Sequence, residues 1–302
     1  MNFLQVEKSI KPINNGPDHA AKLYILTRPP METIVPFLSN KILKVDSGKN
    51  ITMKLFQTLS QLVVLSGLVS SLTQTDMDTF GSKTFTEANT GLQGYVSVTD
   101  DGQGNWVISG NGIPDHETGT FPSNRSPNEI LESEYTYTVP QEPTVADSPT
   151  CLPPGPIGVA TNGVVFFNPW TSKGKNAIEQ ETFDLCDGHP NGKGVYHYHK
   201  MPSSCLFTVE DGVPSPLIGI AFDGFGIYGP IDENGNTLTS SDLDACHGRF
   251  NSDGVYQYHA TTNFPYILGC FTGKPFNIRN ALLNGDKCYF ASDADSETGD
   301  VE

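Results

Sequence analysis

Short stretches in which hydrophobic and polar residues alternate predict β-strands along much of the chain. The clearest candidates are residues 95–98 (YVSV), 106–109 (WVIS) and 134–140 (EYTYTVP). Residues 100–105 (DDGQGN) predict a hairpin turn between the first two, because they are rich in Asp, Gly and Asn. The proline-rich residues 143–156 predict a connector to the rest of the chain.

The strand that carries the most chemistry is predicted at residues 195–199, VYHYH. Successive side chains of a strand point to opposite faces, so His197 and His199 share one face. Tyr196 and Tyr198 take the other face and are expected to pack in the core. Neutral imidazole binds zinc, copper, iron and nickel, so this pair predicts half of a metal site. The alternative is a half-buried strand whose histidines only form hydrogen bonds.

A second copy of this segment follows sixty residues later. Residues 244–259 align with residues 184–199 without a gap, with nine identities in sixteen positions. The similarity extends upstream, where IGVATNG at 157–163 corresponds to IGIAFDG at 218–224. One unit alone would bury little apolar surface, so we expect two units to pack face to face. The sequence therefore predicts a mainly β, disulfide-stapled, β-sandwich-like domain built around a tandem repeat of about sixty residues.

The second unit is poorer in imidazole than the first. Gln257 stands where the first unit has His197, and Arg249 stands where it has His189. His259 is retained, and we expect it to reach the same site across a pseudo-two-fold axis. The candidate metal ligands, in order of preference, are His197, His199, His116, His189 and His259.

Two turn residues and one further histidine complete the candidate site. Asp223 and Asn162 occupy equivalent positions in the two units, and we expect them to orient the imidazoles from behind. Alternatively, each side chain caps its own turn before the following glycine. His247 is out of register with His189, which predicts a place on the loop surface.

The donor set favours copper or zinc as the bound ion. Several imidazoles with little thiolate suit both metals, and the Irving–Williams order gives copper the higher raw affinity. Calcium is less favoured, because the oxygen-rich residues 232–236 (DENGN) have their glycine in the wrong place for an EF-hand. These residues are better explained as a tight turn.

Composition narrows the class of protein. The 302 residues include 18 Lys+Arg and 34 Asp+Glu, for a net charge of -16, which argues against nucleic acid and anionic membranes as partners. Thirty glycines, 22 prolines and a hydrophobic content of 37% indicate a loop-rich β protein. The acidity suits a soluble extracytoplasmic protein or one that gathers cations, and a merely solubilising surface is the plainer alternative.

All six cysteines follow residue 150, and an even number suggests disulfides if the chain is secreted. The repeat favours pairs that bracket each tyrosine strand, which leaves the first and last cysteines for each other. Thiolate ligation of a metal is the rival explanation, but the sequence contains no Cys-x-x-Cys. The predicted pairs are Cys186–Cys205, Cys246–Cys270 and Cys151–Cys288.

The beginning of the chain contains a signal-peptide pattern at residues 53–72: a basic start, a short apolar stretch and small residues. We therefore interpret residues 1–52 as an extension or non-native segment, and we expect no membrane insertion after cleavage. The alternative is an uncleaved internal anchor. The remaining predicted parts are an N-terminal β segment at 73–150, the duplicated core at 151–290 and an acidic tail at 291–302.

The run YHYH, its Cys-x-Gly-His loop and the segment IGIAFDGFGIYGP together resemble the YHYH domain family of secreted bacterial and microbial eukaryotic proteins. The resemblance covers roughly residues 110–270 and includes GIPDH at 112–116 and Asn162 with its following glycine. Two positions depart from the pattern: Gly226 stands where the family often has proline, and Arg249 where histidine would match the first unit. The resemblance implies secretion and no established activity.

Three classes of function remain. The first is a secreted protein that binds copper or zinc for uptake, buffering or delivery, with the metal ion as its partner. The second is a secreted metal-dependent enzyme, hydrolytic or oxidative, because a three-histidine site with an open position is also a catalytic pattern. The third is an extracellular or cell-surface structural module with a partner of unknown identity. No Gly-x-Ser-x-Gly, phosphate loop or His-Glu-x-x-His is present, which disfavours nucleophilic and zincin-type hydrolysis.

Overall fold

The computed structural model describes residues 72–81 and 83–275. The predicted extension, nearly all of the signal peptide and the acidic tail lie outside the described residues. Strands dominate this part of the chain, and the prediction of a mainly β fold is confirmed. The helical elements are short: α2 (Gln74–Phe80), α3 (Ala177–Gln180), α4 (Ser203–Leu206) and the 3-10 turn η2 (Ser240–Asp242).

The N-terminal segment forms a four-stranded antiparallel sheet in the order β1-β2-β3-β4. Its strands are β1 (Lys83–Thr86), β2 (Gln93–Asp100), β3 (Asn105–Gly110) and β4 (Tyr135–Pro140). The predicted hairpin turn joins β2 and β3, whose last register pair is Asp100 and Trp106. The Asp101 carboxylate holds this turn by accepting hydrogen bonds from the backbone amides of Gln103 and Asn105. Alternating burial along β3 gives this sheet one apolar face.

The rest of the chain builds an eight-stranded sheet whose two halves have the same strand order. The order is β12-β13-β11-β10-β6-β7-β9-β8, so each unit contributes four neighbouring strands. In both halves the inner two strands are antiparallel, the next pairing is parallel and the outermost pairing is antiparallel. The strands are β6 (Pro156–Ala160), β7 (Val165–Phe167), β8 (Gly188–Pro190), β9 (Tyr196–Tyr198), β10 (Leu217–Ala221), β11 (Gly226–Tyr228), β12 (Gly248–Phe250) and β13 (Tyr256–His259).

The two units meet edge to edge, which corrects the expectation that they pack face to face. Their apolar strands β6 and β10 pair antiparallel at the centre of the sheet. Gly158 and Gly219 permit this close approach, because a Cβ atom at either residue would lie 2.5 to 2.6 Å from a carbonyl oxygen of the opposite strand. Backbone pairing therefore joins the units, and the apolar face is left for another layer.

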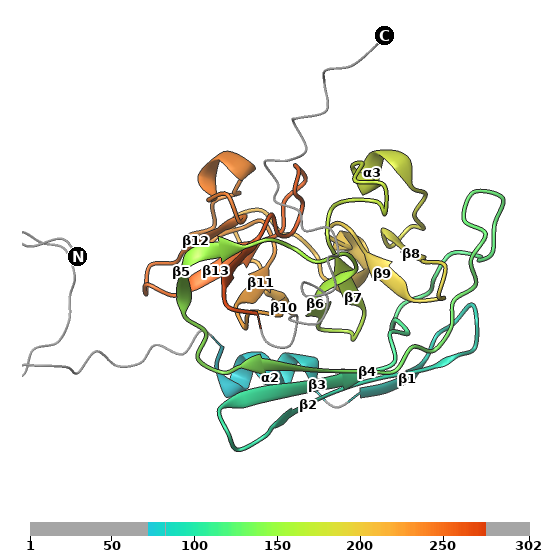
Figure 1. Ribbon diagram of the computed structural model, residues 1–302, viewed down its shortest axis with the longest axis horizontal. Helices are drawn as coiled ribbons and strands as arrows, with labels where there is room; N and C mark the ends of the chain where they lie inside the picture. Colours follow the sequence, from blue (N-terminus) through green and yellow to red (C-terminus); the bar gives the residue numbers. More distant parts are fainter. Residues whose placement is uncertain (1–71, 82, 276–302) are drawn as a thin grey trace, which may run out of the picture. The chain divides into compact units, whose positions relative to one another are not determined.

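The four-stranded sheet supplies that layer. Figure 1 shows it running along one side of the eight-stranded sheet. Val96 and Ile108 from the first sheet and Ile157 from the second are fully buried in one core. The rings of Tyr137 and Phe222 connect the layers at a centroid distance of 4.3 Å. The two sheets thus form two layers, and the tyrosine side chains of β9 and β13 point into the core.

The proline-rich connector contains a strand that the sequence did not predict. Residues Val145–Thr150 form β5, which pairs antiparallel with β14 (Phe271–Gly273) despite Pro149 within it. Proline is tolerated at sheet edges, and this sheet consists of two edge strands. This pairing joins β14, which follows the second unit, to the connector that precedes the first unit.

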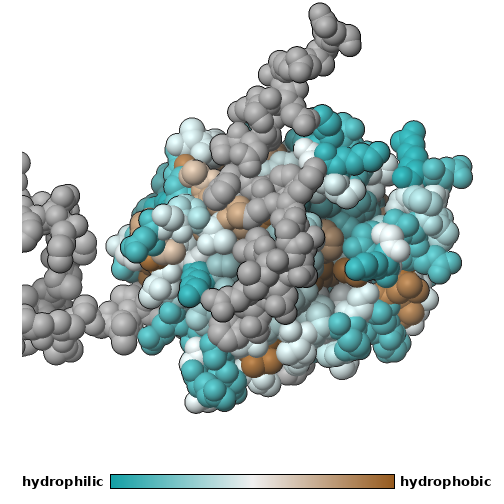
Figure 2. Space-filling model, in the orientation of Figure 1, coloured by the Kyte–Doolittle hydropathy of each residue, from teal (hydrophilic) through white to brown (hydrophobic). Residues whose placement is uncertain are grey.

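The surface agrees with the acidic composition. On the face drawn in Figure 2, hydrophilic residues predominate and apolar residues form small separate areas. Among the described residues, no helix has the length and apolar character needed to cross a membrane.

Candidate metal centre

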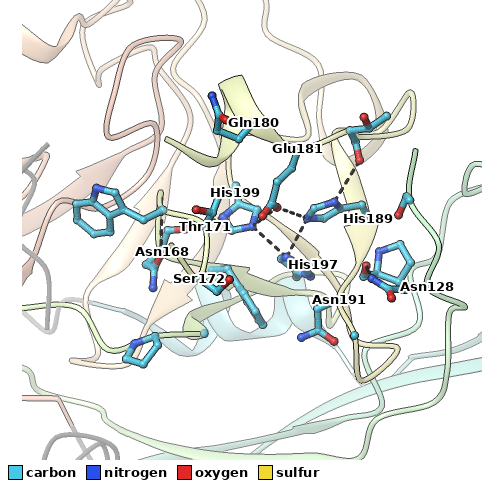
Figure 3. A pocket seen from close by; sticks show the side chains of 18 of the residues that line it. Asn128, Asn168, Thr171, Ser172, Gln180, Glu181, His189, Asn191, His197 and His199 are labelled. Atoms are coloured by element: carbon cyan, nitrogen blue, oxygen red, sulfur yellow. Dashed lines mark hydrogen bonds and ion pairs between the residues drawn. The ribbon is translucent and has the colours of Figure 1, made fainter. Parts of the chain in front are cut away.

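Three histidines converge on one face of the outer strands β8 and β9. His189 lies directly opposite His197 in the antiparallel register, and His199 follows two residues later on the same face. The three side chains are buried, with exposed fractions of 7%, 2% and 3%. The structure thus brings together three of the five candidate ligands (Figure 3).

Backbone carbonyl groups orient each imidazole through its Nδ1 atom. The oxygens of Thr182, Val195 and Asn168 lie 3.1, 2.9 and 2.6 Å from the Nδ1 atoms of His189, His197 and His199 in turn. A carbonyl oxygen only accepts hydrogen bonds, so in a neutral ring the proton resides on Nδ1. The Nε2 atoms are left with lone pairs, as in the metal-ligating tautomer.

These lone pairs point at one another. The Nε2 atom of His197 lies 3.1 Å from Nε2 of His189 and 3.0 Å from Nε2 of His199. Burial lowers the pKa of His199 to about 4, and burial together with the neighbouring histidines holds the pKa of His197 well below its usual range. Both rings are therefore neutral near pH 7. Two acceptors stand 3.0 Å apart with no proton to share, an arrangement that a bound cation would relieve.

A carboxylate completes the cluster. Glu181, directly after α3, places its Oε2 atom 3.1 Å from Nε2 of His189 and 3.5 Å from Nε2 of His199. Burial alone would raise the pKa of Glu181, but its interactions with His189 and His199 outweigh burial and lower it. Glu181 was not among the residues predicted from the sequence, because no motif surrounds it and only the return of residues 171–183 over β8 brings it to the histidines.

The spacing of the four donor atoms matches that of metal ligands. With metal–ligand bonds of about 2.1 Å, neighbouring ligand atoms are about 3.4 Å apart in a tetrahedron and about 3.0 Å apart at right angles. The four separations given above run from 3.0 to 3.5 Å. The three imidazole nitrogens lie within 4.8 Å of one another, so one ion among them could contact all three, with Glu181 beside two of them.

A cavity of about 620 Å³ opens onto the cluster. The three histidines and Glu181 line it, as do neutral polar side chains from several loops (Figure 3). Arg125 is the one cationic residue of its lining. The aromatic ring of Phe167 stacks on His197 at a centroid distance of 3.9 Å and fixes its plane. The cluster is thus rigid on the protein side and accessible from the cavity.

His116 lies on the opposite face of β9, away from the cluster. Its Nε2 atom is 2.6 Å from the hydroxyl oxygen of Tyr198, which also accepts a hydrogen bond of 3.0 Å from Nδ2 of Asn162. The geometry also places Sγ atoms of Cys186 and Cys205 near His116. These two cysteines form a disulfide, so they offer no thiolate to a metal. The structure assigns His116 to the core network around Tyr198.

His259 lies in the other half of the sheet. Four strands lie between β13 and β9 in the sheet. The five inter-strand spacings of about 4.8 Å place the two strands about 24 Å apart. His259 repeats the backbone contact of His199, since its Nδ1 atom is 2.9 Å from the carbonyl oxygen of Gly229. The pseudo-two-fold axis therefore separates the two candidate positions and does not bring them to one site.

An ion pair replaces the histidine cluster in the second unit. Arg249, in the register position of His189, binds Glu233 through two hydrogen bonds of 2.7 and 3.2 Å. His247 is buried rather than on the loop surface, and its Nε2 atom is 3.0 Å from Oγ1 of Thr261. The second unit keeps the backbone arrangement and has different chemistry.

Asp223 and Asn162 contact tyrosines and not imidazoles. Asp223 accepts a 2.6 Å hydrogen bond from the hydroxyl of Tyr258, and burial raises the pKa of Asp223 to about 6. Each side chain also accepts a hydrogen bond from the backbone amide two residues on, as expected for a turn cap. The oxygen-rich residues 232–236 form a tight turn, in which Asp232 accepts from the amides of Asn234 and Asn236.

Two of the predicted disulfides are present, and both bracket a tyrosine strand. Cys186 is bonded to Cys205, and Cys246 is bonded to Cys270. Cys288 lies outside the described residues, so its pairing with Cys151 stays a prediction.

The comparisons with known proteins identify one family. The family of YHYH proteins matches residues 136–238 and 231–273, which include both units and the whole histidine cluster. No curated protein and no solved structure gives a significant match. The resemblance inferred from the sequence is therefore confirmed.

Proposed function

Residues 136–273 match the YHYH family, and we propose that this chain binds one zinc or copper ion through His189, His197 and His199 of the first unit. Glu181 is the fourth ligand in this proposal. The tetrapeptide that names the family carries two of the three imidazoles, so the proposed site lies at the centre of the matched region.

The observation that carries the proposal is the convergence of unprotonated Nε2 atoms. Buried polar groups in proteins are normally arranged so that donors meet acceptors. Here the Nδ1 protons are used by backbone carbonyls, and the Nε2 atoms of His197 and His199 face each other at 3.0 Å. A purely structural cluster would be expected to place a hydroxyl or amide donor there.

The donor set supports zinc and copper more than harder ions. Three imidazoles and one carboxylate form a common set for a four-coordinate zinc site, and imidazole also suits copper. Calcium and magnesium prefer sites made only of oxygen atoms. In the competition between the two favoured metals, copper has the higher intrinsic affinity and zinc the better match to tetrahedral geometry.

An extracytoplasmic role in metal uptake, buffering or delivery agrees with the remaining features. The disulfides Cys186–Cys205 and Cys246–Cys270 are typical of oxidising compartments. A net charge of -16 attracts cations to the surface. A metal-dependent secreted enzyme is the second candidate, and the cavity of about 620 Å³ beside the cluster is the observation that favours it.

Metal analysis of the purified protein tests the proposal. We expect one zinc or copper ion per chain after incubation with either metal and removal of the excess. The variant His199→Ala should lose this ion, whereas His116→Ala, which removes a histidine outside the cluster, should retain it. Equal metal content in the two variants, or no metal in the wild-type protein, would show that the cluster is structural.

A further inference from the structure

The histidine cluster is enclosed on one side and open on the other. Backbone carbonyls and Phe167 hold the imidazoles from behind, and their side chains are nearly inaccessible. Glu181 differs, because 29% of its side chain is exposed and it lies beside the cavity. A metal ion held by the three Nε2 atoms would therefore have its remaining positions directed toward Glu181 and the cavity.

In the second unit, side chains fill the space that corresponds to this cavity. The turns at residues 170–176 and 231–237 correspond, since each is closed by an isolated β-bridge between its first and last residues. This correspondence places Ser172 at the position of Glu233. Glu233 reaches across to Arg249, whereas the short side chain of Ser172 lines the open cavity. The first unit thus combines small side chains with the histidines and keeps space above them.

The angles within the cluster allow more than four ligands. The Nε2 separations of 3.0 and 3.1 Å also suit ligands at right angles, which lie about 3.0 Å apart. A six-coordinate ion held by three imidazoles and one carboxylate has two further positions for other ligands. An oxygen atom of a small molecule in the cavity would fill a position on the open side of the ion.

We infer that the metal in this site binds a small organic anion, a carboxylate or hydroxamate, through an oxygen atom, and that this ligand occupies the cavity beside Glu181. The inference rests on the proposed metal binding. A cavity of about 620 Å³ lies within the range typical of small-molecule sites. The metal and Arg125 supply the positive charge, and neutral groups of Asn128, Ser172 and Gln180 supply hydrogen-bonding partners for the rest of the molecule.

Cobalt substitution tests this inference separately from metal binding. The visible absorption of bound Co²⁺ changes when its ligands change, so the full chain is loaded with Co²⁺ and titrated with acetohydroxamate. We expect a saturable spectral change while the cobalt remains bound, and no change with neutral acetamide. Ser172→Trp fills the cavity and should weaken acetohydroxamate binding by at least about tenfold. Lys173→Trp is the matched control, because Lys173 is exposed and outside the cavity lining.

Each outcome decides the matter. Cobalt that binds but does not respond to acetohydroxamate would indicate a closed centre and overturn the inference while leaving the proposed metal binding intact. A wild-type response in Ser172→Trp would show that the ligand does not occupy the cavity and would also overturn it. If Ser172→Trp fails to retain cobalt, Gln180→Trp fills the cavity from another segment and gives the same test. Failure of the wild-type chain to bind cobalt, zinc and copper would instead refute the proposed function.

Discussion

Replacing His197 by glutamine is the sharpest test of the metal centre. His197 is the central member of the cluster, in contact with the Nε2 atoms of both His189 and His199. The repeat supplies the substitution, because Gln257 occupies the equivalent strand position and register in the second unit. Glutamine should therefore be accommodated by the fold while removing one imidazole ligand.

The expected effect on metal-dependent stability is large. Loss of a group that only orients a ligand weakens metal affinity by about 10- to 100-fold, so loss of the ligand itself should cost about 100-fold or more. Metal at about 1,000 times its Kd stabilises the folded wild-type protein by about 4.1 kcal/mol. At the same metal concentration, the ratio of metal concentration to Kd is only about 10 in the variant, which stabilises the folded variant by about 1.4 kcal/mol. The metal-induced gain should fall by about 2.7 kcal/mol.

Urea unfolding with and without zinc measures this quantity in His197→Gln and in the wild-type protein. The control is Gln257→Ala, which alters the equivalent position in the second unit and should leave the zinc-induced gain unchanged. Similar stability of the two metal-free proteins would show that the fold tolerates glutamine. A zinc-induced gain in His197→Gln as large as that of the wild type would refute the assignment of His197 as a ligand.

Three further outcomes follow from the contacts. Arg249→His combined with Gln257→His should create a second histidine cluster, and calorimetric titration should then show two bound metal ions per chain rather than one. The metal-free protein should lose stability as the pH falls from about 6.5 toward 4, by up to about 1.4 kcal/mol per pH unit for His199 alone. The reason is that His199 binds a proton in the unfolded chain in this pH range, whereas its buried ring in the folded protein stays neutral. A free energy of unfolding, measured with urea, that does not change with pH would contradict this. Tyr198→Phe should destabilise the fold by about 1–3 kcal/mol by leaving the Nδ2 group of buried Asn162 without an acceptor, with metal affinity unchanged. Weakened zinc binding in the same variant would contradict the separation of the two strand faces.

Local periodicity was sufficient to predict the pair at the centre of the cluster. The alternation of residues 195–199 placed His197 and His199 on one face because side-chain direction along a strand depends only on sequence spacing. The spacing of cysteines about the two tyrosine strands likewise predicted the disulfides Cys186–Cys205 and Cys246–Cys270. Both inferences rely on contacts between residues that are close in the chain or repeated along it.

The parts that failed depend on contacts between distant segments. Glu181 reaches the cluster only because a loop folds back over β8, and no sequence motif encodes that return. His116 is 82 residues from Tyr198 in sequence, and nothing in its own segment indicated on which face of the sheet it would arrive. His259 was placed near the first site because the units were expected to pack face to face, whereas their edge-to-edge pairing separates the two positions by four strands.

Comparison of the two units shows which features of the first unit the fold itself requires. Both units have the same strand order, the same buried tyrosines and a histidine oriented by a backbone carbonyl at His199 or His259. The second unit maintains this arrangement with Arg249 and Glu233 in place of a histidine cluster, so the fold does not require three converging imidazoles. Unpaired acceptors held 3.0 Å apart are unfavourable on their own. Their cost in the first unit is therefore an argument for the proposed metal binding, and the metal content of the protein is the measurement that tests it.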